Sequence, residues 1–205
     1  MKKRLMLGSI AGLALSAVTG LVQAQDNTFK IGLVLPMSGP FASTGKQMEL
    51  AVRLYMAQHG DTVAGRKVVL IVKDDTGAPD VTKRIAQELV INDKVQVLAG
   101  FGLTPLAMAT APVATQSKTP LVVMAAATSI ITEASPFIVR TSFTVPQVVT
   151  TLADWATKNN IKKVVSLVTD YAPGIDSEKY FNQRFINNGG VVIETLRVPL
   201  RSPDF

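Results

Sequence analysis

The sequence predicts an α/β fold in which two lobes are each built around a parallel sheet. Short, continuous apolar runs rich in β-branched residues recur along the chain, and stretches with helical spacing of apolar residues alternate with them. Such alternation is typical of parallel strands that helices cover on both faces. The pattern breaks once, at residues 142–146, where Ser142-Phe143-Thr144-Val145-Pro146 suits a connection between lobes. The second lobe is predicted to be incomplete.

The first residues have the pattern of a secretory signal peptide. A basic start, Met1-Lys2-Lys3-Arg4, precedes an apolar stretch from Leu5 to Val18 and then the small residue Ala24. This order is typical of a cleaved export signal. We therefore expect residues 1–24 to be removed after Ala24 and the protein to reach the periplasm. An uncleaved membrane anchor is the alternative, although the stretch is short for spanning a bilayer.

Composition excludes several classes of function. The chain has no Cys, so thiol catalysis, thiolate metal sites and disulfides are excluded. Its formal net charge is +6, and removing three of the 21 basic residues with the signal leaves 18 against 15 acidic residues, or +3. The basic residues are scattered and form no arginine-rich stripe. A nucleic-acid partner is therefore not expected.

Residues 25–141 are predicted to form the first lobe. The apolar runs predict strands at Phe29–Leu35, Lys67–Lys73, Val95–Ala99, Leu121–Met124 and Phe137–Thr141. The helical spacing predicts helices at Gly45–Gly60, from Val81, at Pro105–Gln116 and, briefly, near Ile130. In the first helix, Met48, Val52 and Tyr55 are expected on the inward face, and Pro112 is expected to kink or shorten the third.

Residues 147–205 are predicted to begin the second lobe. The elements expected there are a helix at Val148–Asn159, a strand at Lys163–Thr169, a helix at Ser177–Asn187 and a strand at Gly190–Val198. Leu152, together with Trp155 or Ala156, is expected to point inward. Two strands are too few for an independent sheet core, and the last residues, 201–205, have the composition of a loop. We therefore expect the chain to be a fragment of a longer two-lobed protein.

Ligands of open parallel sheets bind outside the carboxyl ends of the strands. Four segments leave those ends in the predicted fold, and all are rich in small and hydroxyl residues: Pro36–Gly45, Gly100–Pro105, Ala125–Ser129 and Asp170–Gly174. A small carboxylate needs backbone N–H and hydroxyl donors, and a helix start offers them in a favourable field. Thr104 and the turn ending Thr128-Ser129 provide such donors. The alternative is that these hydroxyls only cap helices.

Other motifs do not support a catalytic, metal or cofactor site. Gly100-Phe101-Gly102 lacks the third glycine of a dinucleotide turn. Asp74-Asp75 lacks calcium-loop spacing and is predicted to be a solvated turn, with Asp80 capping the next helix. His59 is the single histidine, and no nucleophile with an oriented base is found.

Several segments resemble the periplasmic Leu/Ile/Val-type (branched-chain amino acid) substrate-binding proteins of ABC transporters. The run from Val34 to Ala42 (VLPMSGPFA), a following Gly45 and a long helix are similar to the amino-terminal portion of that family. The similar segments further along the chain are Lys73-Asp74-Asp75, Thr104-Pro105, Ala111-Pro112-Val113-Ala114, Ala126-Ala127-Thr128 and Asp170-Tyr171-Ala172-Pro173-Gly174. The resemblance covers essentially all of the chain after the signal, in order.

This resemblance implies a type I periplasmic binding fold, with two α/β lobes, a hinge and a ligand enclosed between them. It implies ligand contacts from Thr104, from the backbone of Ala126, and from Ala127 and Thr128. Thr44 occupies the place of an aromatic residue that often contacts the ligand. The family often carries a Tyr at the position that Pro173 occupies here. Tyr171 lies two residues earlier, and it would stack on a ligand or pack between the lobes.

The same resemblance implies capture of an amino acid of the branched-chain type, or a related small carboxylate, for an ABC permease in the inner membrane. No cofactor is implied. The acidic residue that pairs with a ligand ammonium in the family would lie beyond Phe205, so an aromatic or aliphatic carboxylate stays open. The alternatives are an exported ligand-sensing domain, an exported hydrolase, and a truncated piece without function.

Overall fold

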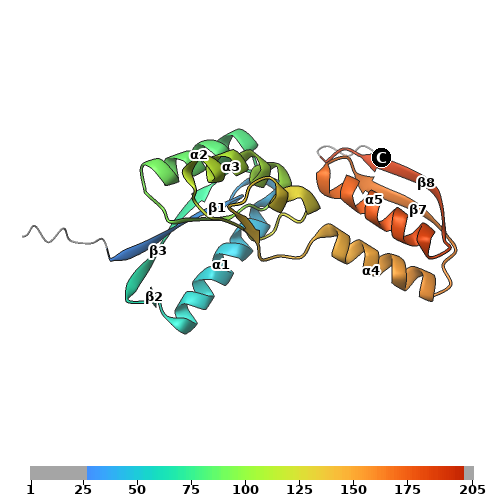
Figure 1. Cartoon of the computed structure of the whole chain (residues 1–205), viewed down its shortest axis with the longest axis horizontal. Coiled ribbons are helices and arrows are strands. Elements are labelled where there is room, and N and C mark those ends of the chain that lie inside the picture. The colour runs from blue at the N-terminus through green and yellow to red at the C-terminus, as the bar shows by residue number, and fades with distance from the viewer. Residues whose placement is uncertain (1–26, 201–205) are drawn as a thin grey trace, which may run out of the picture.

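A computed structural model describes residues 27–200 as two sheets with helices packed on them (Figure 1). The larger sheet has six strands in the order β2-β3-β1-β4-β5-β6, and the smaller pairs β7 with β8. All neighbouring strands are parallel except β2 and β3. The expected signal peptide and the expected terminal loop at 201–205 lie outside the described residues. Within residues 27–200, no helix has the length and apolar character needed to cross a membrane.

The elements alternate along the chain as expected, except for the two-residue strand β2, which was not predicted. The strands are β1 (Thr28–Leu35), β2 (Thr62–Val63), β3 (Arg66–Asp74), β4 (Val97–Gly100), β5 (Leu121–Val123), β6 (Ile138–Arg140), β7 (Lys163–Thr169) and β8 (Val191–Val198). The α-helices are α1 (Ala42–His59), α2 (Pro79–Ile91), α3 (Thr104–Ser117), α4 (Val145–Lys158) and α5 (Ala172–Asn187). Two 3₁₀ turns, η1 (Gly39–Phe41) and η2 (Ser129–Glu133), complete the described chain.

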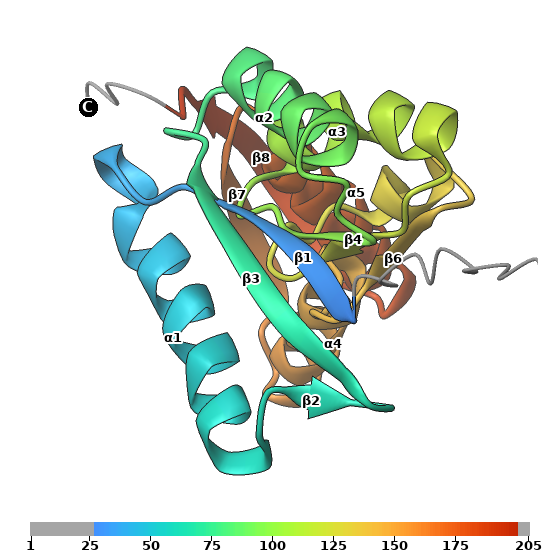
Figure 2. The ribbon, with the colours of Figure 1, turned by 90° about the vertical axis from the view of Figure 1, so that its left-hand side faces the viewer.

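Helices cover both faces of the six-stranded sheet. Successive side chains of a strand point to opposite faces: Val34 of β1 belongs to the core beneath α2 and α3, whereas Leu33 and Leu35 belong to the core on the α1 side. Figure 2 shows α1 on one side of β1 and β3, with α2 and α3 on the other. The continuous apolar run of β1 is therefore explained by burial on both faces.

The second unit is smaller. Helices α4 and α5 pack against each other and against the two strands β7 and β8 around Ala153, Ala156 and Phe185 (Figure 1). Of the alternatives Trp155 and Ala156, it is Ala156 that points inward and is buried, whereas Trp155 is 55% exposed. The prediction for Leu152 is wrong, because this residue is half exposed.

Helix α1 departs from the expected burial in the same way. Met48 and Val52 pack against the sheet as predicted, but Tyr55 is 63% exposed and stacks on His59. No described element covers this part of the helix. Apolar spacing therefore identified the helix correctly and overestimated the width of its buried face.

Helices α4 and α5 begin three and five residues earlier than predicted, and a proline explains each early start. Pro146 and Pro173 lie within the first two positions of α4 and α5, where a proline has no hydrogen-bond partner to lose. Thr144 caps α4 in a reciprocal pair with Gln147. The extended connection after β6 thus ends at Thr144, not at residue 146. Helix α3 runs through Pro112 to Ser117 and is not shortened.

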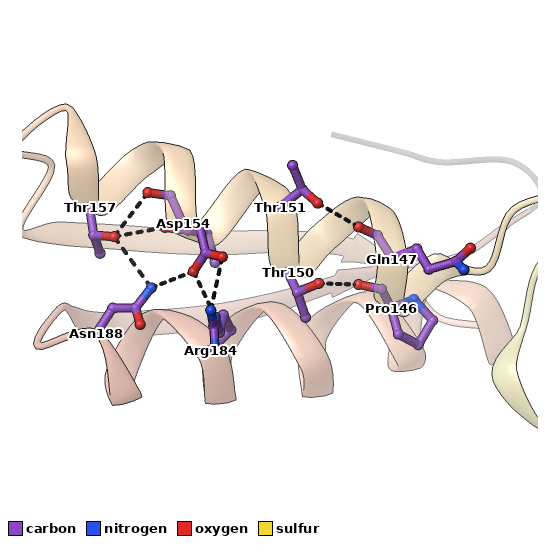
Figure 3. A network of polar contacts seen from close by, with 9 residues as sticks. Pro146, Gln147, Thr150, Thr151, Asp154, Thr157, Arg184 and Asn188 are labelled. Carbon is purple, nitrogen blue, oxygen red and sulfur yellow. Dashed lines mark hydrogen bonds and ion pairs between the residues drawn. The ribbon is translucent and has the colours of Figure 1, made fainter.

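A polar network joins α4 to α5 (Figure 3). The guanidinium of Arg184 donates to both oxygens of Asp154, at 2.6 and 3.0 Å, and the Asn188 amide donates to the same carboxylate at 2.7 Å. Asn188 also donates to the Thr157 hydroxyl at 3.3 Å. These donors lower the pKa of Asp154 from 3.8 to about 2.

This network predicts an acid-sensitive contribution to stability. A carboxyl group with a depressed folded-state pKa stabilises the fold above its unfolded pKa, 3.8, and loses that contribution as the pH falls through about 2. The free energy of unfolding should therefore fall less steeply between pH 4 and pH 2 in Asp154→Asn than in the unchanged chain, as measured by urea titration at each pH. Arg184→Gln should flatten the curve to a smaller extent, because Asn188 still donates to Asp154. Equal slopes in all three proteins would contradict the assignment.

Candidate ligand site between the strand ends

The candidate site lies where the strand order of the larger sheet reverses direction. Strand β1 has β3 on one side and β4 on the other. The chain therefore moves outward from β1 in one direction and then returns to build β4, β5 and β6 in the other. The carboxyl ends of β1 and β4 flank this switch point, where ligands of open α/β sheets bind. Thr104 opens α3 directly after β4, so it stands at this point.

Two threonines predicted separately from the sequence meet here. The hydroxyls of Thr104 and Thr128 are 2.7 Å apart, although the residues are 24 positions apart in the chain. Both residues are buried, with exposures of 2% and 3%. When one hydroxyl donates to the other, a single O–H proton remains for a third group. The pair can therefore offer one donor to a carboxylate oxygen without losing its own bond.

The turn before η2 adds backbone donors. Among the described residues, the amide N–H groups of Ala127 and Thr128 have no hydrogen-bond partner. Both lie in the turn that leads into the 3₁₀ helix η2. N–H groups without a partner beside a buried hydroxyl can donate to an anionic oxygen. Two N–H groups and a threonine hydroxyl are a donor set that suits a carboxylate.

Ala126 is placed differently from its neighbour Ala127. Its N–H donates to the Phe101 carbonyl at 3.1 Å, and its carbonyl accepts from Arg140 at 3.3 Å. Ala126 therefore ties the turn to the segment after β4, and both of its backbone groups are engaged. The carbonyl of Ala127 accepts the N–H of Val145, the first residue of α4, at 2.9 Å.

The sequence predicted that Thr44 lies in a loop, and this prediction is wrong. Thr44 is the third residue of α1, half-buried, and no hydrogen bond joins it to Thr104 or Thr128 within residues 27–200. Gly45 lies inside this helix and directly on the backbone of Pro36, where a Cβ would come within 2.2 Å of the carbonyl oxygen. The glycine therefore allows the helix to contact the Pro36 backbone closely, and it does not mark the end of a loop.

Tyr171 belongs to the second unit. It is the N-cap residue of α5, half-buried, and its N–H donates to Thr169 at 2.9 Å. Burial raises the pKa of its phenol above 10.0, so the ring is a neutral phenol at physiological pH. Its hydroxyl has no hydrogen-bond partner among the described residues. Such a side chain is free to contact a ligand.

The acidic pair after β3 has a structural role. The Asp74 carboxylate accepts the N–H groups of Met37 and Thr76, both at 2.8 Å. Asp75 is fully buried and accepts the Gly77 N–H at 2.9 Å. The prediction of a solvated turn is therefore wrong, as is the prediction that Asp80 caps α2: Asp80 lies in the first turn of the helix.

No metal site accompanies this acidic pair. Within residues 27–200, no group of His, Asp and Glu side chains is placed to hold a metal ion. The burial of Asp75 raises its pKa above 3.8. The two carboxylates instead order the segments that follow β1 and β3, next to the switch point.

The structure adds two polar residues that the sequence did not single out, Arg140 and Asp176. Arg140 donates to the carbonyls of Ala126 and Thr128, and Asp176 accepts from Ser129. Arg140 was recognisable in principle, because a cation at the end of a short apolar strand needs a partner. Asp176 carried no such signal, since an acid near the start of a helix is common.

Comparisons with known proteins give the family. A family model described as "Periplasmic binding protein" matches residues 28–205. The Leu/Ile/Val-binding protein homolog 6 of Brucella abortus (strain 2308) is 43% identical over 204 residues, which cover 99% of this chain and 51% of the relative. The chain thus spans about half the length of this curated relative.

Two solved structures are similar in fold and sequence. A solute-binding protein of an ABC transporter from Rhodopseudomonas palustris BisB5, in complex with 3,4-dihydroxybenzoic acid, matches with a TM-score of 0.85 and 59% identity, over 87% of this chain and 49% of that one. A second, from R. palustris in complex with 4-hydroxybenzoate, matches with a TM-score of 0.83 and 43% identity, over 87% and 49%. Because the family match extends from β1 to the end of the chain, the resemblance seen in the sequence is confirmed: this chain belongs to the periplasmic binding proteins.

Proposed function

We propose that this chain forms the ligand-docking part of a periplasmic receptor that captures a small aromatic carboxylate, such as a hydroxybenzoate, and delivers it to an ABC permease in the inner membrane. The observation that carries the proposal is the donor set at the switch point. The hydroxyl pair of Thr104 and Thr128 lies beside a turn whose Ala127 and Thr128 N–H groups have no other partner among the described residues.

The donor set favours an anion with two oxygens. One carboxylate oxygen would accept the free hydroxyl proton of the threonine pair, and the other would accept the backbone N–H groups. Among residues 27–200, no acidic side chain is hydrogen-bonded to either threonine, and the Asp176 carboxylate beside them already accepts from Ser129 through both oxygens. The hydroxybenzoate ligands of the two R. palustris proteins support an aromatic carboxylate.

A branched-chain amino acid is the second candidate. The name of the B. abortus relative supports it. Both candidate ligands carry a carboxylate. They differ in the rest of the molecule, which is an aromatic ring in one case and an ammonium group with an aliphatic side chain in the other. Tyr171, from the second unit, would lie over an aromatic ring or an aliphatic side chain when the lobes close by a hinge motion.

The proposal includes the organisation of the whole chain. Residues 1–24 would be the export signal, cleaved after Ala24, residues 25–141 the first lobe, and residues 147–205 the start of the second. The connection at 142–146 would be the hinge, with its extended part ending at Thr144. The receptor would bind its ligand without converting it, so the ligand should be recovered chemically unchanged.

A thermal melt with a panel of ligands tests this function. A ligand that binds only the folded state raises its stability by about 2.7 kcal/mol at 100 times its Kd. We expect 4-hydroxybenzoate and 3,4-dihydroxybenzoate to raise the Tm, and 4-hydroxybenzyl alcohol, which lacks the carboxylate, to leave it unchanged. A rise with leucine alone would favour the second candidate. A cooperative melt that no carboxylate shifts would refute the carboxylate site.

A further inference from the structure

A buried carboxylate links the two units beside the candidate site. Asp176 lies in the first part of α5 and is 9% exposed. Its Oδ2 accepts the N–H of Ser129 at 2.7 Å, and its Oδ1 accepts the Ser129 hydroxyl at 3.1 Å. Ser129 opens η2 and directly follows Thr128. The carboxylate of the smaller unit is thus bound, through both oxygens, to the residue next to the proposed ligand donors.

A charged group of the opposite sign holds the same turn from the larger unit. Arg140, at the end of β6, donates from one guanidinium nitrogen to the carbonyls of Ala126 at 3.3 Å and Thr128 at 2.6 Å. Its charge interacts favourably with that of Asp176. Hydrogen bonds to charged groups are roughly twice as strong as neutral ones. In the segment from Ala126 to Ser129, the carbonyls of Ala126 and Thr128 are therefore held by Arg140 of the larger unit. Ser129 is held by Asp176 of the smaller unit.

This double attachment has a mechanical consequence. A rotation of α5 away from the larger sheet would pull on Ser129, whereas Arg140 would hold the preceding residues. The Thr128 N–H and hydroxyl lie between these two points. The conformation of the donor turn and the separation of the two units then depend on each other, because a change in either would break a hydrogen bond to Asp176 or to Arg140.

We propose that Asp176 is a positioning residue that couples the separation of the two units to the shape of the carboxylate-binding turn. The proposal rests on the function proposed above, since it concerns the same turn, but it concerns a residue that touches Ser129 and not the ligand. A purely local role, in which Asp176 only caps η2, is the competing explanation. The two differ in whether the loss of the carboxylate changes the distance between the units.

The absence of cysteine makes that distance measurable. Cys residues introduced at the exposed positions Lys83 in α2 and Gln183 in α5 would carry a spin label on each unit. In Asp176→Asn, without ligand, we expect a broader distribution of label distances, and exchange of the Ser129 amide hydrogen that is roughly tenfold faster or more. Ser129→Ala keeps the N–H bond and loses the hydroxyl bond, so it should broaden the distribution less.

Asp170→Asn is the matched control. It removes the same charge from the segment before α5, but Asp170 is exposed and its ion pair, at 3.7 Å, is with Arg197 of β8. This variant should retain the unaltered distance distribution and the slow Ser129 exchange. If Asp176→Asn accelerates Ser129 exchange but leaves the distances unchanged, Asp176 is a local cap and the proposal is overturned. Unchanged exchange overturns it as well.

The ligand arm separates this proposal from the function on which it rests. If the unaltered chain binds 4-hydroxybenzoate, Asp176→Asn should weaken binding by roughly tenfold, because the turn then has to be ordered on binding, and Asp170→Asn should not. Unchanged affinity in Asp176→Asn would overturn the coupling to the ligand. If the unaltered chain binds no carboxylate, the proposed function fails, and the distances measured without ligand still decide whether Asp176 couples the units.

Discussion

Replacing Thr128 with Val should weaken the binding of 4-hydroxybenzoate by roughly 30- to 150-fold, the equivalent of about 2–3 kcal/mol. The substitution keeps the shape of the side chain and removes its hydroxyl. The proposed carboxylate contact loses one donor, and the buried hydroxyl of Thr104 loses its partner 2.7 Å away. Isothermal titration of both proteins with the same ligand preparation measures the change.

Thr110 offers a control with the same chemistry. It is fully buried in α3, and its hydroxyl donates only to the Leu106 carbonyl one turn earlier, at 3.0 Å. Thr110→Val therefore removes a buried threonine hydroxyl without touching the donor turn, and affinity should be retained. If Thr110→Val and Thr128→Val weaken binding equally, the loss arises from general destabilisation and the threonine pair is not the carboxylate site.

A double-mutant cycle extends this test to Thr104. Because the two hydroxyls form one unit, Thr104→Val should already cost much of the affinity, and adding Thr128→Val should cost less than it does alone. Additive losses would mean that the two hydroxyls act independently on the ligand, contrary to the 2.7 Å contact between them.

The sequence predicted that Thr104 and Thr128 lie at the same edge of the sheet, because one general rule applies to both residues. Both come after apolar runs that read as parallel strands, and the carboxyl ends of such strands lie at one edge of the sheet. The strands followed equally well from apolar runs and the helices from helical spacing, as β1 and α1 show. The 2.7 Å contact itself also requires β4 and β5 to be neighbours in the sheet, which the apolar runs do not show.

What the sequence could not supply are contacts that depend on how the two units meet. The bond between Asp176 and Ser129 joins residues 47 positions apart on different units, and neither residue type signals it. Leu152 and Tyr55 were misplaced for a related reason: their apolar character predicts burial, but only the arrangement of neighbouring elements decides which side of a helix is covered. Thr44 was assigned to a loop because Gly45 resembled a helix boundary, whereas it marks a close backbone contact.

Gly100→Ala should lower the free energy of unfolding by about 3 kcal/mol or more, since two separate penalties fall on one residue. Gly100 ends β4 at φ +117°, a backbone conformation that residues with a side chain rarely adopt. A Cβ there would also lie 2.1 Å from the carbonyl oxygen of Val34 in the neighbouring strand β1. That carbonyl accepts the Phe101 N–H at 3.0 Å, so the added Cβ would disturb a hydrogen bond between β1 and the segment after β4, at the switch point.

Gly39→Ala separates the two penalties. Gly39 also has a positive φ, +72°, but nothing lies within 4 Å of the position its Cβ would take. This variant should lose only about 1 kcal/mol, the ordinary cost of a side chain in the left-handed region. Urea unfolding followed by circular dichroism measures both, with an unchanged m-value showing that stability alone has altered. Equal losses of unfolding free energy in the two variants would mean that β4 and β1 move apart to make room for the added Cβ. The strand ends at the site would then be too mobile to hold carboxylate donors in fixed positions.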